Sequence, residues 1–298
     1  MWIKSIYFLF HKIRLAFFVK LRYNRSVIKF QFERTFVMKK KIALFAAGTL
    51  LCASLTGCGG PAANTVFSAD DLPGKTIGAQ LGTTGYIYAC DEVENATVEP
   101  YNKGADAIQA LKQGKIDAVI IDSEPAKVFV EKNDTLKILD DPFVEEEYAI
   151  AYKKGNDELG SKIDDALTHL KDDGTLAEIT SHWIGVDADH VPYTPDSSLS
   201  RSNGTITMAT NAEFPPYESV ENGEIVGVDV DMMNAVCDYL DMELVVENME
   251  FDSIVAAVDS GKADVGVAGM SVTEDRLKNV SFTQGYTVST QVIIVRKD

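Results

Sequence analysis

A regular alternation of short apolar runs and helical stretches, which begins at Asp71, is the feature that most limits the fold of this chain. The apolar runs are rich in small and β-branched residues, as strands in a sheet flanked by helices must be. The order is typical of βα units and predicts an α/β fold. We expect strands at residues 76–80, 97–101, 116–121, 148–152, 205–210, 244–247, 265–268 and 291–296. We expect helices at residues 86–93, 105–113, 124–132, 157–171, 175–183, 229–240, 252–260 and 273–278.

One stretch of 18 residues interrupts this alternation. Residues 186–203 contain Pro192, Pro195 and several Ser residues with no apolar period, which is typical of a linker. On either side lies one copy of a faint repeat, residues 110–122 (ALKQGKIDAVIID) and residues 257–269 (AVDSGKADVGVAG). The copies end at Asp122 and Gly269, two candidate binding residues. We therefore expect two similar α/β lobes that face each other across a cleft.

The first 57 residues differ in charge from the rest of the chain. They hold 11 of the 28 Lys and Arg residues but only one of the 45 Asp and Glu residues. The remainder has 17 basic and 44 acidic residues, a net charge of −27. This acidity argues against nucleic acid as a partner of the folded part.

A signal-like pattern ends this basic region. The basic residues 38–41 (MKKK) precede an apolar run, residues 42–54, that is too short to span a bilayer comfortably, and residues 55–58 (LTGC) follow. The pattern resembles a bacterial lipoprotein signal peptide, in which cleavage precedes the Cys and the Cys is lipidated. This resemblance predicts lipidation of Cys58; an ordinary signal peptide and an uncleaved anchor are the alternatives. Residues 1–37 then read as an untranslated or non-structural extension, with an amphipathic membrane-surface segment as the alternative.

The cysteines and histidines give no metal pattern. Cys52 falls within the signal, and Cys90 and Cys237 lie far apart on predicted helices. We expect these two to pack as small apolar residues rather than to form a disulfide. The four His residues are scattered, so neither a metal nor another cofactor is predicted.

Residues 265–276 (VGVAGMSVTEDR) are the stretch where we expect a ligand. They read as a buried strand, a turn and a short helix with Thr273 as its N-cap. Arg276 would stand in the first turn of that helix, where a cation opposes the helix dipole. A bound anion, held by Arg276, the Ser271 hydroxyl and free backbone N–H groups, would explain the position. The alternative is a surface Arg paired with Glu274 or Asp275.

Six stretches from Asp71 onward form a recognisable set: residues 71–78 (DLPGKTIG), 81–85 (LGTTG), 210–218 (TNAEFPPYE), 227–231 (GVDVD), 249–251 (MEF) and 268–276 (AGMSVTEDR). With these stretches the chain resembles the polar amino-acid substrate-binding proteins of ABC importers, the bacterial extracellular solute-binding family 3. The resemblance implies a two-lobed periplasmic-binding-protein-like (type II) fold with a hinged cleft.

The resemblance also implies a role for individual residues. The carboxylate-binding Arg of the family falls on Arg276, assisted by Ser271 and by the backbone around Gly269 and Thr84. The carboxylate that grips the ligand's α-ammonium group falls on Asp122. One fixed cation and one fixed anion, between apolar walls that exclude water, suit a zwitterion.

The remaining implied residues shape the site. Aromatic walls fall on Phe214 and Phe251, and side-chain selectors on Asn211 and Gln80. Thr83 and Glu213 complete the predicted ligand-binding set. Taken singly, several have plainer explanations, such as a core position for Phe251 and turn positions for Asn211 and Thr83.

The order of the two lobes departs from the family. The lobe with the Gly-Thr-Thr-Gly sequence comes first here, whereas in the family the lobe with the Arg motif comes first. We interpret the order as a circular permutation; a truncated tandem fusion or a domain-swapped dimer would give the same order. The predicted segments are a tether at 58–70, a smaller lobe at 71–150 completed by 291–298, helices at 151–185 that pack on the larger lobe, a linker at 186–204 and the larger lobe at 205–290, after the signal peptide at 38–57.

The sequence thus predicts a lipid-anchored, extracytoplasmic and monomeric protein that captures a polar or charged amino acid. Its expected partners are the transmembrane subunits of an ABC permease. Two alternatives remain. One is a small-acid dehydratase-like enzyme on the same fold, for which Glu213 is the available general acid or base. The other is a ligand-sensing ectodomain.

Overall fold

The structure, a computed structural model, describes residues 63–140 and 142–297. Contacts divide the chain into the units Met1–Gly60 and Pro61–Asp298, and the fold below is that of the second unit. The predicted extension, signal peptide, Cys52 and Cys58 lie outside the described residues. Within the described part, no helix combines the length and the apolar character that crossing a membrane needs.

The elements follow one another in the βα order that the sequence predicts. Before the linker they are η2 (Ala69–Asp71), β1 (Thr76–Gln80), α2 (Thr84–Asp91), β2 (Thr97–Tyr101), α3 (Gly104–Lys112), β3 (Ala118–Asp122), α4 (Ser123–Glu131), β4 (Leu136–Ile138), β5 (Val144–Lys153), α5 (Asp157–Asp172) and α6 (Thr175–Trp183). After it they are β6 (Thr205–Thr210), β7 (Glu213–Phe214), β8 (Glu218–Glu221), β9 (Glu224–Val226), α7 (Val228–Leu240), β10 (Glu243–Asn248), η3 (Phe251–Ser253), α8 (Ile254–Ser260), β11 (Val265–Gly266), η4 (Arg276–Lys278) and β12 (Val280–Arg296).

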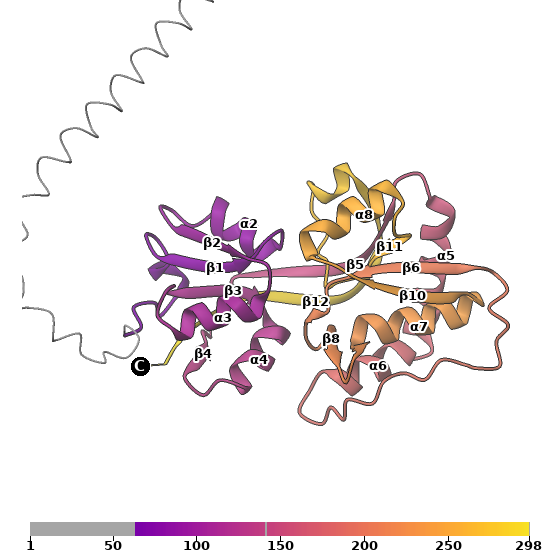
Figure 1. The fold of residues 1–298 in the computed structure, drawn as a ribbon, viewed down its shortest axis with the longest axis horizontal. Coiled ribbons are helices and arrows are strands. Elements are labelled where there is room, and N and C mark those ends of the chain that lie inside the picture. The colour runs from indigo at the N-terminus through magenta and orange to yellow at the C-terminus, as the bar shows by residue number, and fades with distance from the viewer. Residues whose placement is uncertain (1–62, 141, 298) are drawn as a thin grey trace, which may run out of the picture. The chain divides into compact units, whose positions relative to one another are not determined.

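Two antiparallel strands, β5 and β12, join the two halves of the unit (Figure 1). They stand at the centre of a sheet whose order is β10-β6-β11-β5-β12-β3-β1-β2, and β4 also pairs with β12. On one side, β1 to β4 with α2 to α4 form the smaller lobe; on the other, β6 to β11 with α5 to α8 form the larger lobe. Every pair among β1, β2 and β3 or among β6, β10 and β11 that bonds directly is parallel.

The buried faces follow from the spacing of apolar residues. In α5 the side chains of Ile163, Ala166, Leu167 and Leu170 are buried, at the helical spacing i, i+3, i+4, i+7. This stripe packs towards α7 and β12. Each fully buried Leu or Ile contributes about 1.5 to 3 kcal/mol, so α5 is held to the larger lobe by its apolar face.

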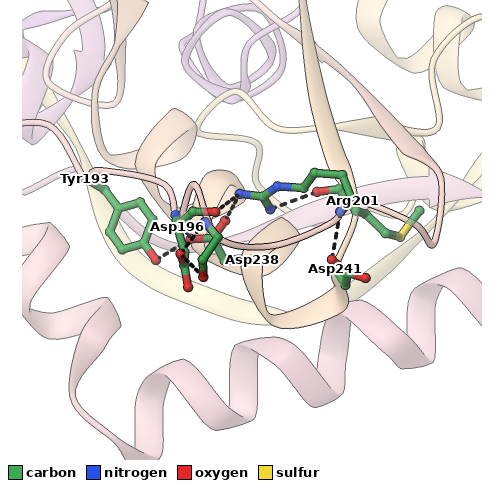
Figure 2. A network of polar contacts seen from close by, with 7 residues as sticks. Tyr193, Asp196, Arg201, Asp238 and Asp241 are labelled. Atoms are coloured by element: carbon green, nitrogen blue, oxygen red, sulfur yellow. Dashed lines mark hydrogen bonds and ion pairs between the residues drawn. The ribbon is translucent and has the colours of Figure 1, made fainter.

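The stretch predicted as a linker is fastened to the larger lobe (Figure 2). Arg201 Nη2 donates to Asp238 Oδ1 at 2.5 Å, and the Tyr193 hydroxyl donates to Asp238 Oδ2 at 2.8 Å. The backbone N–H of Arg201 donates to Asp241 Oδ1 at 2.8 Å, at the C-terminal end of α7. Residues 186–204 therefore join α6 to β6 as a bound strap, with both ends on one lobe.

Several local predictions were wrong. The helix expected at 273–278 is only the three-residue 3-10 turn η4. Thr273 lies in a turn before it, in which the Arg276 N–H donates to Thr273 Oγ1 at 3.2 Å. The strand expected from residue 291 begins at Val280, and β4, β7, β8 and β9 were missed. Cys90 is exposed instead of packed, whereas Cys237 is buried, and the two remain free thiols.

Candidate functional site

A narrow cavity lies where the two lobes face each other. The space that the centre of a water molecule can occupy in it is about 10 Å³, so it has room for about one water. Ten predicted ligand residues and Ala268 line it: Gln80, Thr83, Thr84, Asp122, Asn211, Phe214, Phe251, Gly269, Ser271 and Arg276. Most of them follow β1, β3, β6 or β11, whose carboxyl ends are the usual ligand positions of open α/β sheets.

Arg276 crosses from one lobe to the other. Its Nη1 donates to the Ser271 carbonyl at 2.6 Å, and its Nη2 donates to the Gly82 carbonyl at 3.0 Å. The guanidinium carbon lies 5.3 Å from the centre of the Phe251 ring, a cation–π distance. Only 8% of the residue is exposed. Burial lowers the pKa of the Arg276 guanidinium, and the charge of Glu146 opposes this shift.

The main energetic cost of placing Arg276 here is different from the one expected. A three-residue 3-10 turn carries little dipole, so the helix dipole is a minor cost. The larger cost is the desolvation of a cation, since a buried charge needs compensating partners. Two carbonyl oxygens and an aromatic face compensate part of it, and Arg276 has further N–H donors to offer.

Asp122 supplies the opposite charge. It ends β3, and 5% of it is exposed. Its Oδ1 accepts bonds from the Tyr148 hydroxyl at 2.5 Å and the Ser289 hydroxyl at 3.2 Å. Burial raises the pKa of the Asp122 carboxyl from 3.8 to about 6, although these hydroxyls pull it down. Asp122 stands at the N-cap position of α4, but its side chain makes no capping hydrogen bond there.

Two amides close one end of the cavity. Gln80 Nε2 donates to Asn211 Oδ1 across the cleft at 2.8 Å, and Asn211 Nδ2 donates to the Met249 carbonyl at 2.8 Å. Phe214 forms an apolar wall and stacks on Tyr217, with 5.8 Å between ring centres. Thr83 accepts the Tyr86 N–H at 3.3 Å as the N-cap of α2, so this residue has a local structural role as well as a place in the cavity.

Gly269 is fixed by a buried carboxylate. Its N–H donates to Asp229 Oδ2 at 2.8 Å, and the Tyr286 hydroxyl donates to the same oxygen at 3.0 Å. Gly269 has a φ of +51°, and a Cβ there would lie 2.6 Å from Cε1 of Phe214. Only glycine therefore fits between this wall and the backbone. Burial raises the pKa of Asp229 to about 6.

Glu213 does not line the cavity. Its carboxylate pairs with Lys103 at 2.5 Å, which joins the two lobes at the partly exposed rim. The structure thus separates Glu213 from the other predicted residues.

The residues that the sequence did not reveal come mainly from β5 and β12. Tyr148, Ser289, Gln291 and Glu146 contact Asp122, Thr84 or Ser271. No motif marks them, because their position depends on the β5–β12 register. Alternation along β5 was the available signal: Glu146 and Tyr148 lie two residues apart and so share one face of the strand.

This arrangement suits a small molecule that carries both charges. Arg276 offers a fixed cation, Asp122 a fixed anion, and Phe214 and Phe251 exclude water between them. Among the described residues no His, Cys, Asp and Glu side chains gather as metal ligands would.

Residues 93–186 and 206–298 match the model of the family described as bacterial extracellular solute-binding proteins, family 3. The L-cystine-binding protein TcyJ of Escherichia coli (strain K12) is 36% identical over 124 residues, which are 41% of this chain and 47% of that protein. The ABC transporter arginine-binding protein 1 of the same strain is 38% identical over 94 residues, 31% of this chain and 39% of that protein.

The matched parts are fragments of the relatives. The chain spans about half the length, or less, of these curated relatives. A solved ancestral arginine-binding protein bound to arginine is 43% identical over 26% of this chain and 34% of that chain, with a TM-score of 0.25.

Proposed function

The chain belongs to the bacterial extracellular solute-binding proteins of family 3, and we propose that it captures an amino acid outside the cytoplasm for an ABC importer. The observation that carries the proposal is that buried Arg276 and buried Asp122 both line one cavity between two lobes. An α-amino acid has a carboxylate for the first and an ammonium group for the second. Similar proteins are named for binding cystine and arginine.

Binding requires the lobes to separate. The cavity has room for about one water, and the Gln80–Asn211 bond and the Arg276–Gly82 bond cross it. An amino acid would enter an opened cleft, and its two charges would then be enclosed as the lobes close. Hinge closure around a ligand is an established mode of motion for two-lobed binding proteins.

A thermal-shift screen tests this function. The full chain would be heated with each of the twenty amino acids and with L-cystine. A ligand at a hundred times its dissociation constant adds about 2.7 kcal/mol of stability, and Arg276→Ala, which should bind about 30-fold or more weakly, should cut that gain to below about 1 kcal/mol. If no amino acid raises the melting temperature of the wild-type protein, the proposed function is wrong.

We infer a binding protein rather than an enzyme. The enzyme alternative needs a general acid or base aimed into the cavity, and Glu213, its candidate, is paired with Lys103 at the rim. On our proposal Glu213→Ala changes the preference among amino acids more than the overall affinity. On the enzyme alternative, it would abolish turnover of a small acid while binding persisted.

The proposal includes a lipid anchor at Cys58 in the extracytoplasmic setting of the family. Its support is the sequence of residues 38–58, which resembles a lipoprotein signal peptide. A labelled fatty acid should enter the wild-type protein and be absent from Cys58→Ala, which should also leave the membrane fraction. Equal labelling of both would contradict the anchor.

We also propose that the order of the lobes is a circular permutation and that the protein is a monomer. In its support, one chain supplies the cavity with residues from both sides of the strap, such as Asp122 and Arg276. The strap joins two elements of one lobe, so a second molecule is not needed to complete it. Light scattering should give a monomer and calorimetry one ligand per chain. An obligate dimer would favour the domain-swapped alternative.

A further inference from the structure

Glu146 connects the two lobes through hydrogen bonds of its side chain. It lies on β5, one of the two strands that join the lobes. Its Oε2 accepts a bond from the Thr84 hydroxyl of the smaller lobe at 2.7 Å. The same oxygen accepts a bond from the Ser271 hydroxyl of the larger lobe at 3.0 Å. Both donors line the cavity, although Glu146 itself does not.

Two further donors fix the carboxylate in this place. Gln291 Nε2, on the neighbouring β12, donates to Oε2 at 2.9 Å, and the Tyr88 hydroxyl donates to Oε1 at 3.0 Å. Oε2 therefore accepts three bonds and Oε1 accepts one, and these four bonds hold the carboxylate in one position. Hydrogen bonds to a charged acceptor are about twice as strong as neutral ones.

These bonds depend on how close the lobes are. Thr84 begins α2, and Ser271 follows β11, so the two hydroxyls belong to bodies that move apart when the cleft opens. Each hydroxyl has one proton to donate, and both protons go to one oxygen. Opening the cleft must break at least one of these bonds.

We propose that Glu146 is a positioning residue that acts as a latch: its carboxylate stabilises the closed arrangement by holding one hydroxyl from each lobe. A ligand that has entered the opened cleft is then enclosed with Arg276 and Asp122 opposite each other. The effect on ligand affinity rests on the proposed function, whereas the effect on lobe closure does not.

The latch makes a quantitative link between closure and affinity. When the complex exists only with the lobes closed, the apparent dissociation constant is the intrinsic one divided by the fraction of free protein that is closed. Losing the latch lowers that fraction. Where the closed form is the minor one, affinity and closure fall by the same factor.

Hydrogen exchange of the full chain in detergent, without any amino acid, tests closure. In Glu146→Ala, amides in residues 82–88 and 269–277 should exchange about tenfold faster or more, while β3 keeps its protection as a measure of global stability. In Glu146→Gln, which keeps an acceptor oxygen, these amides should exchange at rates between those of the wild type and of Glu146→Ala. Glu145→Ala is the matched control, because Glu145 is exposed on the same strand and faces the other side.

Ser271→Ala separates the latch from local loosening, because Ser271 lies on the other lobe from residues 82–88. If the bond to Ser271 bridges the lobes, Ser271→Ala should by itself speed the exchange of residues 82–88. Unchanged exchange of these residues in Ser271→Ala would contradict the proposal. So would faster exchange in β3, which would show that Glu146 supports the fold as a whole.

Calorimetry with the amino acid found by the thermal-shift screen gives the second result. The affinity of Glu146→Ala should fall by no more than the factor lost in exchange protection, with Glu145→Ala unchanged. A rise in affinity would overturn the latch, because it would make Glu146 a competitor for the donors of the ligand carboxylate. Failure of the screen would remove this second result and leave the exchange result to decide.

Discussion

The raised pKa of Asp122 predicts that amino-acid binding weakens in mild acid. Burial moves the pKa of this carboxyl from 3.8 to about 6. Below that pH, Asp122 is neutral in the free protein and cannot pair with the ligand's ammonium group. An ammonium group beside the carboxylate favours the charged form, so the pKa is lower in the complex. Binding must therefore release a proton from Asp122 in acid.

The size of the effect follows from the shift. With a free-state pKa of about 6 and a bound-state pKa well below 5, affinity at pH 5 should be about tenfold lower than at pH 7, or about 1.4 kcal/mol. About 0.9 proton should be released per ligand at pH 5, and about 0.1 at pH 7. The described His residues lie on α5, α6 and the strap, outside the cavity.

Titration calorimetry in buffers of different ionisation enthalpy measures both quantities. Asp122→Asn is the control: its affinity should be low and constant from pH 5 to pH 7, with no proton released. Wild-type affinity that stays constant over this range would refute the assignment of Asp122 to the ammonium group. Proton uptake on binding would refute it as well.

The same residue predicts a difference in stability without ligand. A carboxyl whose pKa is raised in the folded state stabilises the protein below pH 3.8, and this stability is lost as the pH rises through about 6. The shift of about 2 pH units corresponds to about 3 kcal/mol. As the pH rises from 4 to 7, the free energy of unfolding of Asp122→Asn should therefore increase relative to that of the wild type by up to about 3 kcal/mol. Chemical denaturation measures this difference. A constant difference would contradict the buried ionisation.

Three further predictions concern the other charged groups. Arg276→Ala should lower affinity by about 2 to 5 kcal/mol, because it leaves a buried ligand charge unpaired; calorimetry and circular dichroism would separate binding from folding. Burial and the nearby Asp229 raise the pKa of Glu218 well above its usual 4.5, so its contribution to stability is lost as the pH rises through that higher value. Glu218→Gln should therefore lose less stability than the wild type as the pH rises above 4.5 in denaturant titrations. Arg201→Ala, which removes the side-chain bond from Arg201 to Asp238, should cost about 1 to 3 kcal/mol of unfolding free energy, whereas the exposed control Lys162→Ala should cost at most about 0.5 kcal/mol.

The sequence predicted the βα order because periodicity reports local burial directly. The predicted strand at 97–101 and helix at 175–183 agree residue for residue with β2 and α6, since each is bounded by turn residues. Where bounds failed, long-range pairing decided them. β12 extends back to Val280 because β5 pairs along its length, with register shifts near Gly285. A strand that owes its length to its partner leaves little trace in its own sequence.

The contacts of the strap also depend on residues that are distant in the sequence. Its Pro and Ser residues correctly predicted irregular backbone between α6 and β6. Composition could not show that Arg201 reaches Asp238, because that bond depends on where α7 ends. Arg201 has a φ of +54°, uncommon for a residue other than glycine, and its two bonds to Asp238 and Asp241 hold it there.

The site residues at the strand ends of each lobe could be predicted from motifs, whereas those on the shared strands could not, and this difference bears on the order of the lobes. Residues that follow β1, β3, β6 and β11 carry recognisable motifs, because each lobe shapes its own strand ends without the other. Glu146, Tyr148 and Gln291 lie on the two strands shared by both lobes, where side chains must fit partners from both directions. A change in the order of the lobes leaves each set of strand ends intact, provided that β5 and β12 still pair. The proposed permutation can therefore preserve the cavity, and the β5–β12 pair, with Glu146 on it, is the part of the fold on which that preservation depends.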